Sequence, residues 1–126
     1  MAASAKDLVA AAECLRGTRV LILGDMVADI YIDGRISRIS REAPVLVLEE
    51  MGERVVAGGA ANVAHNLALL GTNVSIAGYV GDDAHCKSLL EKFSARGIDY
   101  RGLIHTDRPT TTKIRIIGGH QQMLRL

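Results

Sequence analysis

The residues best suited to chemistry begin with two aspartates, Asp25 and Asp29, in the segment Gly-Asp-Met-Val-Ala-Asp at residues 24–29. This segment follows a short apolar run at residues 20–23, which favours a strand. In open α/β sheets, ligands bind beyond the carboxyl ends of the strands. A carboxylate there can accept two hydrogen bonds from adjacent hydroxyl groups of a sugar. Either aspartate could instead cap a turn, and spacing alone does not separate the two explanations.

A second candidate is the segment Gly-Gly-Ala-Ala-Asn at residues 58–62. Gly58 and Gly59 stand at the start of a predicted helix, where a ligand can approach a backbone that carries no Cβ. The helix start also offers free N–H donors, and Asn62 could add an amide. No Gly-Lys-Ser/Thr follows, and the spacing does not fit a dinucleotide-binding motif. Taken alone, a glycine pair favours a tight turn with close helix packing.

Two further features have simpler explanations. The segment Gly-Tyr-Val-Gly-Asp-Asp at residues 78–83 favours a glycine turn followed by an aspartate that caps a helix. Arginine suits a phosphate because its planar fork can donate two hydrogen bonds, although a solvated strand face explains any single basic residue. The basic residues are Arg35, Arg38, Arg41, Arg54, Lys113 and Arg115.

Metal and nucleophile chemistry find no support in the sequence. The histidines are scattered and no pair has zinc-ligand spacing. No Gly-x-Ser-x-Gly segment is present either. The sequence therefore predicts no metal site. The histidines are His65, His85, His105 and His120.

Composition restricts the class of protein. The chain has 126 residues, of which 48% are hydrophobic and 23% charged, so we expect one folded domain or a piece of a larger one. A net charge of +1 and few aromatic residues argue against nucleic acid or a membrane as partner. No stretch approaches the roughly 18 apolar residues that span a membrane. Cys14 and Cys86 are predicted to be free, and the predicted location is cytoplasmic.

The elements that must position these residues alternate between strands and helices. Helices are predicted over residues 4–16, 60–70 and about 83–96, and apolar strands over residues 20–23 and 74–78. This order is typical of right-handed crossovers in a parallel sheet. The unbroken run at 20–23 predicts a strand that is covered on both faces. The expected buried stripes are Val63, Leu67 and Leu70 in the second helix and Leu89, Leu90 and Phe93 in the third.

An insertion separates the first strand from its helix. Residues 30–40 alternate until Gly34, and residues 45–50 form a second strand after Pro44, so the two predict a small antiparallel flap. Later, residues 110–117 and 121–126 are predicted strands joined by a hairpin turn at Gly118-Gly119. The sequence stops within this apolar strand pattern, which predicts truncation.

Taken together, residues 24–29, 37–44 (Ser-Arg-Ile-Ser-Arg-Glu-Ala-Pro) and 58–64 resemble the ribokinase-like (PfkB-type) carbohydrate kinases. Within that family they are similar to the bacterial D-glycero-D-manno-heptose 7-phosphate kinases. Residues 110–115 and 121–125 (Gln-Gln-Met-Leu-Arg) share this resemblance, which covers about residues 18–126.

The resemblance implies an α/β fold, a partial ribokinase-like fold with a parallel sheet and a small antiparallel lid. Residues 1–126 would be the N-terminal sugar-binding part, with lid strands near residues 30–50 and 110–126, and the ATP-binding C-terminal part would be absent. In relatives the lid often forms a dimer clasp, so the resemblance also implies a homodimer.

For the site, the resemblance implies that Asp29 binds sugar hydroxyls and that Gly58, Gly59 and Asn62 line the same pocket. Asp25 and Lys113 are further implied contacts. The family's Gly-Ala-Gly-Asp segment, which holds the catalytic base and the anion hole, has no match, so no catalytic residue is expected in this chain.

The implied activity is transfer of the ATP γ-phosphoryl group, with Mg²⁺, to O1 of heptose 7-phosphate for ADP-heptose and lipopolysaccharide core synthesis. One alternative is another PfkB-type sugar or nucleoside kinase. The other is a non-catalytic binding or dimerisation module.

Overall fold

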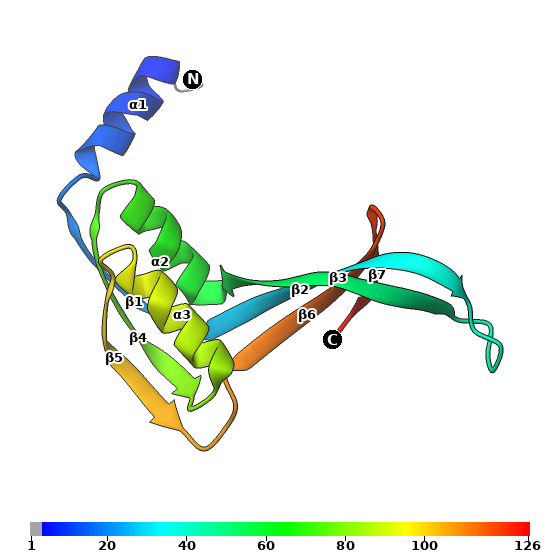
Figure 1. The fold of residues 1–126 in the computed structure, drawn as a ribbon. Helices are drawn as coiled ribbons and strands as arrows, with labels where there is room; N and C mark the ends of the chain where they lie inside the picture. The colour runs from blue at the N-terminus through cyan, green and yellow to red at the C-terminus, as the bar shows by residue number, and fades with distance from the viewer. Residues whose placement is uncertain (1–3) are drawn as a thin grey trace.

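A three-stranded parallel sheet forms the base of the molecule (Figure 1). The structure is a computed structural model that describes residues 4–126; residues 1–3 of the predicted domain lie outside the described residues. The strand order is β1-β4-β5, and both pairs of neighbours are parallel. The strands are β1 (Arg19–Leu23), β4 (Asn73–Gly81) and β5 (Asp99–Thr106).

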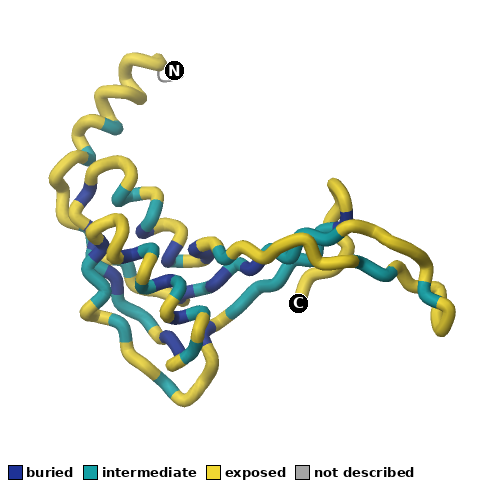
Figure 2. Tube along the Cα trace, viewed as in Figure 1, coloured by how far each residue is buried: buried dark blue, intermediate teal, exposed yellow. Residues whose placement is uncertain are grey.

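Two helices, α2 (Gly59–Leu69) and α3 (Ala84–Ser94), pack on one face of this sheet (Figure 1). Buried residues concentrate between these helices and the strands, as Figure 2 shows. Phe93 and Leu89 from α3 are buried as predicted, and Leu90 is half-buried. The alternating strands and helices therefore form the predicted parallel crossovers.

A second sheet projects from the base as a long arm (Figure 1), which we call the lid. Its strand order is β3-β2-β6-β7. The antiparallel β2–β3 and β6–β7 pairs confirm the predicted flap and hairpin, whereas the parallel pairing of β2 with β6 joins them into one sheet. The strands are β2 (Met26–Ile39), β3 (Leu46–Gly58), β6 (Thr111–Gly118) and β7 (Gln121–Arg125).

The lid strands are longer than predicted, because the alternation of burial begins at Met26 rather than at Ile30. Met26, Ala28 and Ile30 are buried, the first two in the cluster that includes residues of α2 and α3, and Asp29 and the alternate residues on either side of it face the other way. Only Gly24 and Asp25 remain between β1 and β2. Asp29 is therefore a strand residue at the base of the lid.

The prediction that β1 is covered on both faces is wrong for the described residues. Leu21 and Leu23 are 63% and 73% exposed, because α2 and α3 cover only the opposite face. The helix α1 (Ala5–Cys14) does not cover them either: it projects from the base and buries no residue (Figures 1 and 2). An apolar run predicts that a strand is buried, but it does not indicate which elements bury each of its faces.

The prediction of which α2 residues face the core is also wrong. Ala61 and Ala64 are the buried residues, whereas Val63 and Leu70 are exposed and Leu67 is half-buried. Two alanines on this side let α2 lie close to the start of β2, where Ala28 belongs to the same buried cluster. Cys14 and Cys86 are free, as predicted. None of the described helices is long and apolar enough to cross a membrane.

Candidate functional site

The carboxylate of Asp29 lies directly against Gly58. A Cβ added at Gly58 would stand 2.6 Å from the Asp29 Oδ2 atom and 2.9 Å from its Cγ atom. The antiparallel register places them together, because Asp29 is opposite Val56 on β3, two residues before Gly58. The predicted convergence of Asp29 with the glycine turn is therefore present, and only glycine leaves room for it.

Two cations hold the other oxygen of Asp29. Lys113 Nζ and Arg115 NH1 each lie 3.0 Å from Asp29 Oδ1. The parallel register explains this, since Lys113 on β6 is the direct partner of Asp29 and Arg115 is two residues further on the same face. Because both contacts use Oδ1, the Oδ2 atom beside Gly58 keeps its acceptor capacity for a ligand.

Gly59 ties the start of α2 to Asp25. Its φ of +54° is in the left-handed region, and a Cβ there would stand 2.7 Å from the Asp25 carbonyl oxygen. That carbonyl accepts a hydrogen bond of 3.0 Å from the Ala60 N–H. The Asp25 side chain is exposed. The glycine pair therefore fixes both aspartates, Asp29 through its side chain and Asp25 through its backbone.

A hollow of about 530 Å³ opens at the carboxyl ends of β4 and β5. This is the edge at which open α/β sheets bind ligands. Thr111 belongs to it and pairs with Val27, so it lies on the same face of the lid as Asp29. Asp29 and Gly58 do not line the hollow, which adjoins their face of the lid at Thr111. Of this lining, the sequence proposes only Asp25 as a ligand contact. Tyr79 and Val80 fall in the segment explained as a glycine turn, and the turn at residues 106–109 carries no distinctive motif. The lining residues are Asp25, Tyr79, Val80, Thr106, Asp107, Arg108, Pro109 and Thr111.

Asn62 lies in a different place from the one that the resemblance implies. Its side-chain oxygen accepts a hydrogen bond of 3.3 Å from Asn66, one turn along α2. Asn62 also lines a smaller hollow of about 190 Å³ with His65 and Lys92. No hydrogen bond joins Asn62 to Asp25 or Asp29 among residues 4–126. Its part in sugar binding stays a prediction.

Asp83 connects α3 to the start of the lid strand β6. Its carboxylate accepts hydrogen bonds from the Cys86 N–H at 2.8 Å and from the Thr110 N–H at 2.7 Å. Thr110 in turn accepts a hydrogen bond from the Gly81 N–H. Burial alone raises the pKa of Asp83, but these backbone hydrogen bonds outweigh it and lower the pKa below its ordinary value. The cap predicted within residues 78–83 is confirmed.

The basic residues of the lid divide into two groups. Arg54 lies over the Tyr31 ring, with its guanidinium carbon 4.0 Å from the ring centroid, and Arg115 lies 4.9 Å from the same centroid. Arg35 instead pairs with Glu49 on the exposed outer part of the lid. Arg38 and Arg41 are exposed there as well. Of the six candidate basic residues, Arg54, Lys113 and Arg115 therefore lie nearest to Asp29 and Tyr31.

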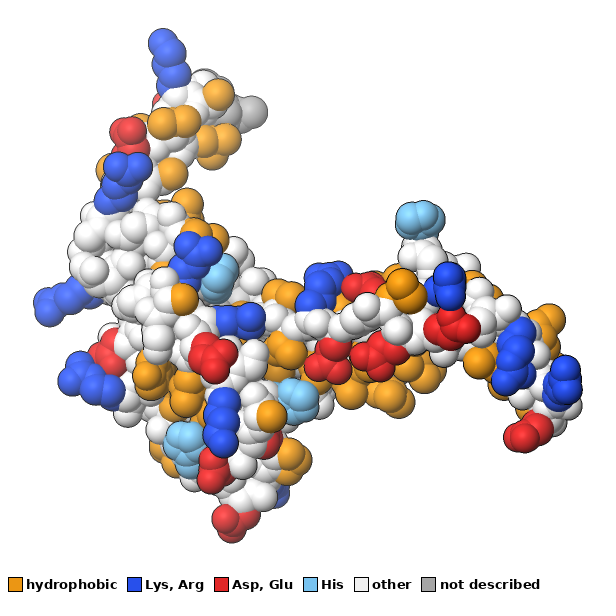
Figure 3. Space-filling model, viewed as in Figure 1, with side chains coloured by type: hydrophobic (Ala, Val, Ile, Leu, Met, Phe, Trp, Pro, Cys, Tyr) orange, Lys and Arg blue, Asp and Glu red, His pale blue; other side chains and the backbone are white. Residues whose placement is uncertain are grey.

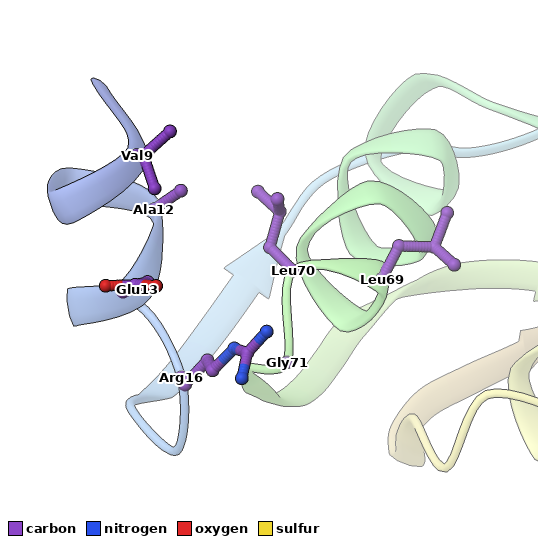
Figure 4. A pocket seen from close by; sticks show the side chains of 7 residues that line it. All are labelled: Val9, Ala12, Glu13, Arg16, Leu69, Leu70 and Gly71. Atoms are coloured by element: carbon purple, nitrogen blue, oxygen red, sulfur yellow. The ribbon is translucent and has the colours of Figure 1, made fainter. Parts of the chain in front are cut away.

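Another hollow, of about 420 Å³, lies between α1 and the end of α2 (Figure 4). Leu69, Leu70 and Gly71 form one side of it, where the chain turns toward the amino end of β4. This is the edge of the sheet opposite to the one that binds ligands in such folds. Within residues 4–126, no three acidic, histidine or cysteine side chains gather as a metal site. The hollow beside Asp25 therefore remains the candidate site.

Comparison with protein families matches most of the chain. The model described as pfkB family carbohydrate kinase matches residues 18–125.

Curated relatives match at 43–50% identity. A protein named "Bifunctional protein HldE" from Methylobacillus flagellatus is 50% identical over 111 residues, which are 85% of this chain and 22% of that protein. A protein of the same name from Helicobacter pylori is 47% identical over 109 residues, 86% of this chain and 24% of that protein. The chain thus spans less than a quarter of the length of these relatives.

Solved structures show the fold at lower identity. Arabidopsis thaliana ribokinase, solved with ribose and ATP, superposes with a TM-score of 0.68 at 20% identity, covering 88% of this chain and 36% of that chain. A Methanocaldococcus jannaschii nucleoside kinase gives a TM-score of 0.66 at 18% identity, covering 88% and 37%. The sheet, the helices and the lid therefore follow a ribokinase-like arrangement.

Proposed function

Because the chain belongs to the pfkB family of carbohydrate kinases, we propose that it is the N-terminal sugar-binding part of an ATP-dependent kinase. The proposed substrate is D-glycero-D-manno-heptose 7-phosphate, phosphorylated at O1 for ADP-heptose and lipopolysaccharide core synthesis. The resemblance of residues 37–44 and 121–125 to heptose 7-phosphate kinases supports this choice, as do the relatives named HldE. A cytoplasmic location fits the two free cysteines.

The contact between Asp29 and Gly58 carries the proposal. The sugar lies over the hollow beside Asp25 and the adjoining face of the lid, and its hydroxyls donate hydrogen bonds to Asp29 Oδ2. Gly58 and Gly59 let the sugar approach the backbone closely. Lys113 and Arg115 hold the carboxylate from its other side. Such positioning contributes several kcal/mol to catalysis when a phosphoryl donor is held in line with the hydroxyl.

The phosphoryl donor is proposed to bind outside these residues. ATP is the proposed donor, and the Arabidopsis ribokinase solved with ribose and ATP supports it. When bound, ATP with Mg²⁺ supplies the transferred phosphoryl group and neutralises its charge. No segment of the sequence matches the family's Gly-Ala-Gly-Asp, and Asp83 is committed to capping α3. We therefore expect the 126-residue chain by itself to show no kinase turnover.

Replacing Asp29 tests the proposal directly. Asp29→Ala should weaken the binding of heptose 7-phosphate by about 1–3 kcal/mol, the usual cost of a lost hydrogen bond to a charged group. Isothermal titration calorimetry measures the affinity, and circular dichroism verifies that the variant is folded. Asp82→Ala, which removes an exposed aspartate beside α3, is the matched control. Unchanged affinity in a folded Asp29→Ala chain would favour the non-catalytic binding module.

A homodimer through the lid is the proposed assembly. Ile36, Leu48 and Met123 surround the position of a Gly118 Cβ, at 3.2, 2.9 and 3.1 Å, so they share one face of the lid. This face is opposite to the one that carries Asp29. Figure 3 shows hydrophobic side chains gathered along the arm, and Leu124 is half exposed. A second copy of the same face would remove this surface from water.

A further inference from the structure

The face of the lid that carries Asp29 collects positive charge from three other strands. Strand alternation puts Asp29, Tyr31 and Asp33 on one face of β2. On β6, Lys113 is the partner of Asp29 and Arg115 is the partner of Tyr31. On β3, Arg54 is the partner of Tyr31. Arg115 is in turn directly opposite Arg125 on β7. We call Arg54, Lys113, Arg115 and the ring of Tyr31 the cationic cluster.

Tyr31 braces the two arginines of the cationic cluster. It lies on the central strand β2, with Arg54 on β3 to one side and Arg115 on β6 to the other. The guanidinium carbons lie 4.0 and 4.9 Å from the ring centroid, within the range of cation–π attraction. Both planar groups are thereby held near the phenol and kept from swinging freely into solvent.

The carboxylates nearby do not use all of the donors that these cations offer. Lys113 and Arg115 share one oxygen of Asp29, while Arg54 meets Asp33 only at 3.6 Å. A guanidinium carries five N–H donors and an ammonium three, so most remain for a further acceptor. The direct pairing of Arg115 with Arg125 places like charges opposite each other, which is unfavourable without an intervening anion. The cluster therefore suits an anionic ligand.

We propose that the cationic cluster is an anion subsite that binds the phosphoryl group already present on the incoming sugar. This assignment rests on the proposed sugar-binding role of Asp29. Tyr31 is two residues beyond Asp29, a distance of about 6–7 Å along a strand. That distance is comparable with the length of a sugar whose hydroxyls lie on Asp29 and whose phosphate lies at Tyr31. Arginine forks bind phosphate with paired hydrogen bonds, and Lys113 adds a point charge.

The subsite makes a sugar phosphate the preferred ligand over the same sugar without phosphate. Calorimetry on the 126-residue chain therefore uses two probes, D-glycero-D-manno-heptose 7-phosphate and unphosphorylated D-glycero-D-manno-heptose. Arg54→Gln is the primary variant, because Arg54 touches Tyr31 and Asp33 but not Asp29. We expect it to weaken binding of the phosphate about tenfold, the effect of one charge-assisted hydrogen bond, and to leave binding of the neutral heptose unchanged.

Arg35→Gln serves as the charge-matched control, since Arg35 is on the same lid but pairs with Glu49. It should leave both affinities unchanged. Tyr31→Leu removes the aromatic ring that Arg54 and Arg115 contact, so it should weaken phosphate binding as Arg54→Gln does. Tyr31→Phe keeps the ring and should retain most of the affinity.

The outcomes separate the subsite from the proposed function. Equal affinity of the unchanged chain for both probes would overturn the subsite and leave the sugar site standing. An equal loss of both ligands in folded Arg54→Gln would also overturn it, because the arginine would then support the sugar itself. Failure of the unchanged chain to bind either probe would overturn both proposals.

Discussion

At the scale of single residues, the site depends on the absence of a side chain at Gly58, since a methyl group there would clash with the Asp29 carboxylate. Gly58 and Asp29 come from different strands, and the carboxylate occupies the volume that a Cβ would need. The types of these residues could be predicted, since glycine pairs and isolated aspartates are conspicuous in a sequence. The partners of Asp29 could not, because Arg115 is 86 residues away and reaches it only through the parallel pairing of β2 with β6.

Gly58→Ala should therefore weaken sugar binding without unfolding the chain. The new Cβ would displace the Asp29 carboxylate, which we expect to weaken binding of heptose 7-phosphate by about 1–2 kcal/mol. Gly52→Ala is a matched control on the same strand, because a Cβ there meets no atom within 4 Å. Calorimetric affinities of the two variants check the prediction. Equal affinities would show that the position of Asp29 does not matter.

At the scale of elements, α3 positions the lid as well as covering the sheet. The Asp83 carboxylate accepts from the first turn of α3 and from Thr110, the residue before β6. The sequence predicts the cap, because aspartate before a helix is a strong local signal. It does not predict the bond to Thr110, which depends on where the chain returns after β5. The strand β5 itself was not predicted, since residues 99–106 mix charged and apolar types without alternation.

Asp83→Ala should destabilise the fold by about 1–3 kcal/mol at neutral pH, because α3 loses its cap and the buried Thr110 N–H loses its acceptor. The lowered pKa of Asp83 fixes the pH dependence. The ionised carboxylate contributes stability above the ordinary aspartate pKa of 3.8, and that contribution disappears as the pH falls through the lower folded pKa. Urea unfolding of Asp83→Ala and the neighbouring Asp82→Ala at two pH values checks this. A cost that stays constant into acid would contradict it.

At the scale of the whole molecule, apolar residues are exposed on both the base and the lid. On the base they include Leu21, Leu23 and Tyr79, and on the lid they include Leu124. The parallel sheet and the antiparallel lid could be predicted from the order of apolar runs and turns. The length of the lid could not be predicted. Local alternation indicates only a short flap, whereas β2 and β3 are long because they pair with each other over their whole length.

Leu124→Lys should abolish self-association through the lid. A buried charge in that interface would have no partner, so we expect a shift from dimer to monomer. Sedimentation equilibrium measures the mass, and Lys87→Glu on the exposed surface of α3 is the control. A chain that is monomeric before substitution would rule out the proposed homodimer.

The account as a whole depends on one placement, that of a sugar phosphate across the Asp25 hollow and the Asp29 face of the lid. An amide NMR titration of the 126-residue chain with D-glycero-D-manno-heptose 7-phosphate measures that placement residue by residue. We predict saturable shifts at Asp29, Gly58, Thr111 and Arg115. Shifts confined to the hollow between α1 and α2, or no saturable shifts at all, would contradict the account.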